Sequence, residues 1–184
     1  MSWRVTTGRA DPASWVPPPW DLFAEGNLVY RNLGDGRFEP AEELGAAFIA
    51  PVEVSRGLAA GDLDDDGDID LLVTNAQSGA RVWRNDADRA GNWLTVRAFD
   101  PRLRRDAIGA RVVVIGEGFR RLGHVTRGNS YLSSSDPRVH FGLGALDAIE
   151  RVEVRWPDGR LESFTVGELN RVVTLSRGSG SSGG

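Results

Sequence analysis

Residues 62–70 read DLDDDGDID, with six aspartates and one glycine in nine positions. The stretches on either side, GLAAG at 57–61 and LLVTN at 71–75, are apolar and short, as expected of two strands. Two carboxylates about 4 Å apart repel by about 1 kcal/mol even at the dielectric constant of water. A turn that holds this many carboxylates therefore needs either open solvent or a bound cation.

The spacing of these aspartates favours the cation. Alternate positions of a tight turn can direct their carboxylates to one point, so that the side chains of Asp65 and Asp68 point outward, and Gly67 lets the backbone bend with a positive φ. Hard oxygen ligands in a flexible loop suit Ca²⁺ better than Mg²⁺, because Mg²⁺ demands a tighter octahedron and keeps its waters. The predicted metal ligands are the carboxylates of Asp62, Asp64, Asp66 and Asp70 and the backbone carbonyl of Asp68.

The acidic turn has two other interpretations. An EF-hand loop has a bidentate glutamate at its twelfth position, but that position is Val73 here, within a strand pattern. A solvated acidic loop without an ion is the second alternative, and such loops are common. The full DxDxDGxxD pattern between two apolar strands is rarer, which favours a metal site. Because its ligands surround the ion, we expect a structural rather than a catalytic role.

Composition excludes several kinds of chemistry. All 22 basic residues are arginines and there is no cysteine, so Schiff-base lysines, disulfides and thiolate metal sites are ruled out. Residues 1–90 carry eight arginines against 16 acidic residues (net −8), and residues 91–184 carry 14 against 10 (net +4). Neither half is charged enough to suggest nucleic acid, and the arginines are scattered along the sequence. No apolar run reaches the roughly 20 residues of a membrane span.

Short strand patterns separated by turn signals cover most of the chain, and no convincing helical period is present. VYRN at 29–32 recurs as VWRN at 82–85, an offset of 53 residues that is typical of propeller blades. We therefore predict an all-β protein in which a β-propeller blade-type repeat precedes a small β-sandwich or barrel-like domain. The predicted parts are a proline-rich connector at 1–23, a blade region with a calcium loop at 24–90, the small β domain at 91–176 and a flexible Gly/Ser tail at 177–184.

The same motifs resemble two known families. GLAAGDLDDDGDIDLLVTN is similar to the FG-GAP/VCBS-type repeat of integrin-α-like β-propellers, and NLVYRNLGDGRF resembles the hairpin that accompanies it. The pieces AIGARV, SYLSSS, HFGLG and WPDG occur in the order typical of the ASPIC/UnbV domain, which follows such propellers. The resemblance spans about residues 24–175.

The resemblance implies an exported, calcium-binding module that serves adhesion or protein interaction without catalysis. Its export signal is expected to lie outside this chain, because no apolar h-region is visible near the N-terminus. Only one complete repeat is present, so the propeller is incomplete, and blades do not bury their faces alone. We therefore expect a longer parent protein, or completion of the sheet edges by a protein partner or by further copies of this chain.

Two other functions were kept as alternatives. A calcium-dependent carbohydrate-binding module is suggested only by analogy with other small β domains. Trp83, Trp93 and Trp156 lie on strand patterns typical of core or domain-interface residues rather than of a sugar-stacking platform. A hydrolase would have to use His124 or His140 with one of the serines near NSYLSSS, but no nucleophile-elbow motif supports it. We therefore expect structural histidines, no enzyme activity, and a partner that is a protein or a glycan rather than nucleic acid. The serines in question are Ser130, Ser133, Ser134 and Ser135.

Overall fold

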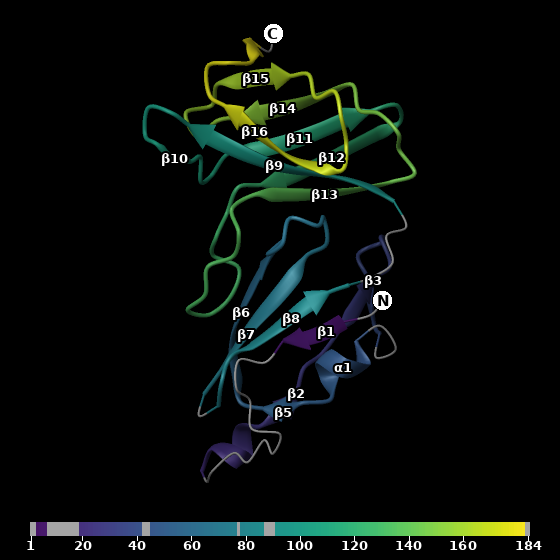
Figure 1. The fold of residues 1–184 in the computed structure, drawn as a ribbon, viewed down its shortest axis with the longest axis vertical. Helices are drawn as coiled ribbons and strands as arrows, with labels where there is room; N and C mark the ends of the chain where they lie inside the picture. The colour runs from purple at the N-terminus through teal and green to yellow at the C-terminus, as the bar shows by residue number, and fades with distance from the viewer. Residues whose placement is uncertain (1–2, 7–18, 42–44, 77, 87–90, 183–184) are drawn as a thin grey trace. The chain divides into compact units, whose positions relative to one another are not determined.

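The computed structural model describes residues 3–6, 19–41, 45–76, 78–86 and 91–182 (Figure 1). Within these residues the protein is nearly all β, as predicted, and its sheets are open, with no closed barrel. The chain divides into two compact units that are each discontinuous in sequence. The first unit comprises Met1–Ala60, Asp68–Asp88 and Asn129–Ser133, and the second comprises Gly61–Gly67, Arg89–Gly128 and Ser134–Gly184.

The first unit is built on a four-stranded sheet, which is the strand number of a propeller blade. Its order is β1 (Trp3–Thr6), β8 (Arg81–Asn85), β7 (Asp70–Asn75) and β6 (Ser55–Gly61). The pair β6 and β7 confirms the two strands expected around the acidic turn. β1 was not expected, because it comes from the stretch predicted as a connector; residues 1–2 and 7–18 of that stretch lie outside the described residues.

Smaller elements complete the first unit. The hairpin expected at 27–40 is present as β3 (Tyr30–Asn32) and β4 (Phe38–Pro40). β2 (Glu25–Gly26) pairs with β5 (Val52–Glu53), and a 3₁₀ turn η1 (Trp20–Phe23) and one helical turn α1 (Ala46–Ile49) lie between strands.

The core of the first unit is small. Phe48 of α1 meets Trp83 of β8 edge to face, with ring centroids 5.3 Å apart, and Val73 of β7 is buried beside them. Val29 and Leu71 are partly buried against this group. Trp83 is 1% exposed, which confirms it as a core residue.

The second unit contains two sheets packed on one larger core. In the first sheet, β9 (Asn92–Asp100) pairs antiparallel with β10 (Arg105–Asp106) and β13 (Val139–Gly144) and parallel with β16 (Arg171–Ser176). The second sheet has the order β12 (Phe119–His124), β11 (Arg111–Gly116), β14 (Arg151–Arg155), β15 (Leu161–Phe164) and β17 (Ser181–Ser182). Figure 1 shows β9 and β16 side by side.

Alternation along the strands explains how the two sheets pack. Val112 and Val114 of β11 are fully buried in the core, as are Val152 and Val154 of β14, whereas Val113 lies outside that core cluster on the other side of the sheet. This period of two is what a strand with one buried face requires. Trp156 is 1% exposed and belongs to the same core, as expected.

The end of the chain differs from the prediction of a flexible tail at 177–184. Ser181 and Ser182 of β17 pair with Ser163 and Glu162 of β15, and the Gly178 N–H donates to both carboxylate oxygens of Glu162 at 2.9 and 3.1 Å. Glu162 is fully buried, so it needs such donors. Residues 177–182 are therefore part of the fold. The buried carboxylate of Glu162 binds the backbone of Gly178, and nothing in the sequence indicates this contact.

A search of the helices in the described residues finds none with the length and apolar character needed to cross a bilayer.

Candidate metal site

The acidic turn joins β6 to β7 and is shaped by the carboxylate of Asp62. Asp62 Oδ1 accepts a hydrogen bond from the Asp66 N–H at 3.0 Å, and Oδ2 accepts one from the Gly67 N–H at 2.9 Å. These two bonds fold the backbone of residues 66 and 67 back onto the side chain of Asp62, the first aspartate of the motif. Gly67 has φ +95°, as expected, and Asp65 has φ +54°.

Three of the predicted ligands come together in this turn. One carboxylate oxygen from each of Asp62, Asp64 and Asp70 lies within 4.8 Å of the others. Asp62 and Asp70 are 3% and 2% exposed, and Asp64 is exposed. Asp66 and Asp68 are not members of this group. Clustered carboxylates with one side open to solvent fit a hard divalent cation; the full set of five ligands stays a prediction.

The surroundings of Asp62 in the turn oppose its ionised form. Burial is the largest cause that raises the pKa of Asp62, and the nearby charges of Asp66 and Asp65 raise it further. The two backbone N–H groups act in the opposite direction. A cation binds the ionised carboxylate, so its binding would offset the cost of burial.

The carboxylate of Asp70 is hydrogen-bonded to the neighbouring strand of the blade sheet. Its Oδ1 accepts a hydrogen bond from the Asn85 N–H at 2.8 Å, at the end of β8. Asn85 closes the VWRN motif, so the repeated motif supplies a backbone donor that orients one carboxylate of the group. The sequence repeat therefore has a local structural meaning beyond forming a strand.

Gly67 packs directly on an indole ring. A Cβ atom at position 67 would lie 2.1 Å from Cε2 of Trp93, so no side chain fits there without displacing the ring. Trp93 is 6% exposed and stacks on His140, with ring centroids 6.0 Å apart and an interplanar angle of 26°. His140 Nδ1 lies 3.1 Å from Oγ1 of Thr95, its cross-strand neighbour. His140 therefore has structural contacts.

Arg138 is the residue near this site that sequence reasoning missed. Its guanidinium donates to the backbone carbonyl of Asp62 at 2.8 Å, to Asp65 Oδ1 at 2.5 Å and to Asp136 Oδ2 at 2.6 Å. Asp65, which was expected to point outward, pairs with this arginine and is not a member of the carboxylate group. Arg138 lies 73 residues from Asp65, and no spacing or motif links the two in the sequence.

Of the other candidate residues, Ser130 and Ser133 form hydrogen bonds to β6. The Leu58 N–H donates to Ser130 Oγ at 3.2 Å, and Ser133 Oγ donates to the Leu58 carbonyl at 2.8 Å. His124 is exposed at the end of β12. Ser134 and Ser135 belong to the second unit, and Ser135 is buried. These contacts give the two hydroxyls at 130 and 133 a role in covering the edge of β6.

Comparison with known proteins identifies both parts of the chain. The model of the ASPIC and UnbV family matches residues 100–182, and the model of the FG-GAP-like repeat matches residues 20–73. Cartilage acidic protein 1 of Homo sapiens is 38% identical over 156 residues, and that of Mus musculus is 37% identical over 156 residues. Each match covers 80% of this chain and 23% of the relative. The Xenopus tropicalis protein of the same name is 34% identical over 128 residues, covering 65% of this chain and 19% of the relative. The chain thus spans less than a quarter of the length of these relatives.

Proposed function

Because the chain carries an FG-GAP-like repeat followed by an ASPIC and UnbV domain and is homologous to cartilage acidic protein 1, we propose that it is an extracellular, non-catalytic interaction module stabilised by Ca²⁺. The names of the matched families and relatives mention no reaction. In this proposal the ion binds in the acidic turn and holds β6 and β7 at the end of the blade. The module then presents its surfaces to a protein partner or to other copies of itself.

One observation carries the metal part of the proposal: three carboxylates lie within 4.8 Å of one another, and two of them are buried. Buried carboxylates at this distance repel strongly unless a cation or protons neutralise them. Asp62, Asp64 and Asp70 are the proposed side-chain ligands. The Asp66 carboxylate and the Asp68 carbonyl are proposed to complete the site when the ion binds, because Ca²⁺ takes 6–8 oxygens in a flexible loop.

Calorimetric titration of the metal-free protein with Ca²⁺ tests this site. We expect one bound ion and an increase in the free energy of unfolding of about 2.7 kcal/mol when free Ca²⁺ is 100 times the dissociation constant. Asp64→Asn, an exposed position, is expected to weaken binding at least about tenfold, which is 1.4 kcal/mol. Asp35→Asn, an exposed carboxylate in the β3–β4 turn, is the matched control. No binding heat at millimolar Ca²⁺, together with equal melting in EGTA, would contradict the proposal.

Self-association is proposed through the sheet edges of the blade, because unpaired strand edges are templates for pairing with another chain. The middle of the β6 edge is already covered, since the Leu58 N–H and carbonyl bond to Ser130 and Ser133. The remaining edge positions are the proposed contact. Sedimentation velocity is expected to show a concentration-dependent increase in mass. A single monomeric species up to the highest soluble concentration, with and without Ca²⁺, would exclude this part of the proposal.

A further inference from the structure

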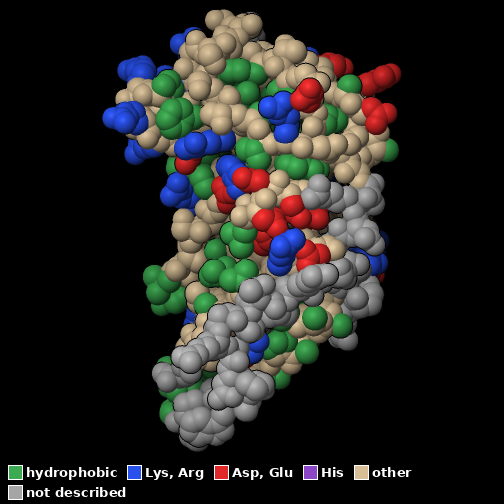
Figure 2. Space-filling view, viewed as in Figure 1, with side chains coloured by type: hydrophobic (Ala, Val, Ile, Leu, Met, Phe, Trp, Pro, Cys, Tyr) green, Lys and Arg blue, Asp and Glu red, His purple; other side chains and the backbone are tan. Residues whose placement is uncertain are grey.

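Arginine side chains gather at one end of the second unit, although they are dispersed in the sequence. The turn between β9 and β10 exposes Arg102 and Arg104, and β10 exposes Arg105. Arg111 of β11 and Arg155 of β14 are exposed as well. We call these five residues the basic end. Figure 2 shows basic side chains concentrated at the end of the unit where Figure 1 labels β10. The strand register places Arg105 beside Asp100 and Arg111 beside Arg155.

Two of these arginines stand directly opposite each other. In the second sheet of this unit, Arg111 of β11 is the cross-strand partner of Arg155 on β14 and of His124 on β12. Partners in register project on the same face, and neighbouring strands are about 4.8 Å apart. Like charges in such pairs destabilise a sheet. The fold therefore carries an electrostatic cost here that a bound anion would relieve.

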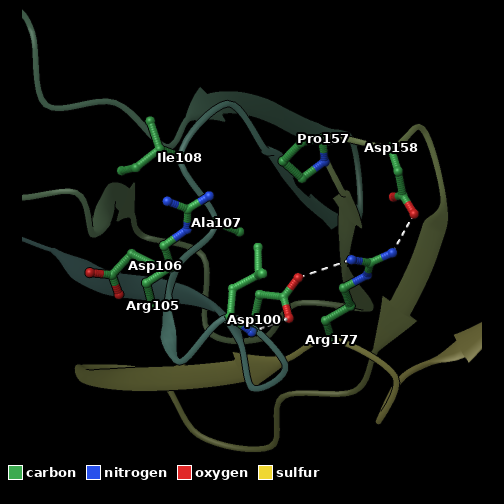
Figure 3. Close-up of a pocket in the computed structure, with 9 residues that line it drawn as sticks. Asp100, Arg105, Asp106, Ala107, Ile108, Pro157, Asp158 and Arg177 are labelled. Carbon is green, nitrogen blue, oxygen red and sulfur yellow. Dashed lines mark hydrogen bonds and ion pairs between the residues drawn. The ribbon is translucent and has the colours of Figure 1, made fainter.

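The carboxylates at this end are already paired with other arginines. Arg177 donates to Asp100 Oδ2 at 2.9 Å and also contacts Asp158, as the dashed lines in Figure 3 show. Asp106 accepts from Arg97 at 2.6 Å and from Arg127 at 3.2 Å. The five residues of the basic end form no ion pair with any residue that the structure describes. Their positive charge is therefore available to a partner.

A cavity of about 430 Å³ joins the two turns at this end. Its walls come from the 103–108 turn, including Leu103, Arg105 and Ile108, and from Pro157 and Asp158 after β14. In Figure 3 the side chain of Arg105 extends along this hollow, across from the Arg177 pairs. Arg105 is the member of the basic end that lines this cavity, beside Arg177 and the ion-paired carboxylates of Asp100, Asp106 and Asp158.

We propose that the basic end binds a sulfated polysaccharide. A guanidinium group donates two parallel hydrogen bonds to an oxyanion such as sulfate. Arginines spread over one turn and three strands match anionic groups repeated along a chain better than one small anion. This site shares no residue with the acidic turn, so binding does not require Ca²⁺.

Other polyanions fit the surface less well. Single-stranded nucleic acid binds through stacking of its bases on aromatic side chains, and the described, exposed positions of the basic end include no Phe, Tyr or Trp. Duplex DNA is usually read by a helix or ribbon placed in a groove, and this end consists of tight turns and strand termini. The remaining alternative ligand of the basic end is an acidic surface on a second copy of this chain.

Heparin binding followed by calorimetry and salt titration tests the proposal on the whole chain. We expect binding in EDTA as strong as in Ca²⁺, a linear fall of log K with log salt, and little binding to desulfated heparin or to oligo(dT). Arg111→Ser/Arg155→Ser is expected to weaken heparin binding roughly tenfold or more and to lower the salt slope by about two. Arg102→Ser/Arg105→Ser should give a similar loss, and it keeps the test valid if the first variant fails to fold.

A charge-matched control is Arg31→Ser/Arg56→Ser, which removes two exposed arginines from the first unit. We expect it to keep wild-type heparin affinity. Equal losses in the control and the basic-end variants would overturn the proposal, because they would show an effect of net charge alone. It would also be overturned by absence of heparin binding at 50 mM salt, or by basic-end variants that bind heparin normally and lose only self-association.

Discussion

Gly67→Ala is expected to lower the free energy of unfolding of the second unit by about 2–5 kcal/mol, or to prevent its folding. Two costs add. Alanine at φ +95° pays roughly 1–2 kcal/mol for the left-handed backbone. Its Cβ would also lie 2.1 Å from the buried ring of Trp93, which must move within a close-packed core. Urea unfolding, monitored by tryptophan fluorescence in EGTA, measures the total.

Gly109→Ala separates the two costs. Gly109 has φ +93°, nearly the same as Gly67, but a Cβ there would meet nothing within 4 Å. This control should lose only about 1–2 kcal/mol. Equal destabilisation by the two substitutions would show that the contact between Gly67 and Trp93 does not constrain the turn.

Arg138→Met is expected to lower the free energy of unfolding in EGTA by about 2–3 kcal/mol. The substitution keeps an apolar stem but removes the donors that bind Asp62, Asp65 and Asp136. Hydrogen bonds to charged groups contribute about 1.5–3 kcal/mol each, and the sum is reduced here because Arg138 is 20% exposed and Asp65 is largely exposed. Denaturant unfolding of the metal-free protein measures the change.

The control for Arg138 is Arg171→Met, since Arg171 is exposed and forms a surface pair with Glu168. Its effect should stay within about 0.5 kcal/mol. A double-mutant cycle with Asp65→Ala then tests the direct contact. A coupling energy below about 0.3 kcal/mol would mean that Arg138 does not hold the turn through Asp65.

The group of three carboxylates could be predicted from the sequence because its members lie within nine residues. Alternating aspartates, a glycine and flanking apolar strands are local features, and local geometry is enough to bring Asp62, Asp64 and Asp70 together. The strands around the turn, the β3–β4 hairpin and the burial of Trp83, Trp93 and Trp156 were predicted for the same reason: period-two patterns and turn residues are short-range signals.

The contacts made over long sequence separation were not predictable in this way. Arg138 reaches the turn from 73 residues beyond Asp65, and buried Glu162 recruits the Gly178 N–H into the fold. The pairing of β1 with β8 likewise joins the two ends of the first unit. Each depends on strand order and register, which a single sequence does not specify.

The sequence by itself determined the all-β class, the blade-like repeat, and the acidic turn with its glycine, because each depends on residues that are neighbours in the chain. The tertiary structure alone decided which arginine binds the turn and where arginines that are scattered in the sequence lie near one another. The physical reason is that charge and packing act through space: strand register brings Arg111 opposite Arg155 although 44 positions separate them in the chain.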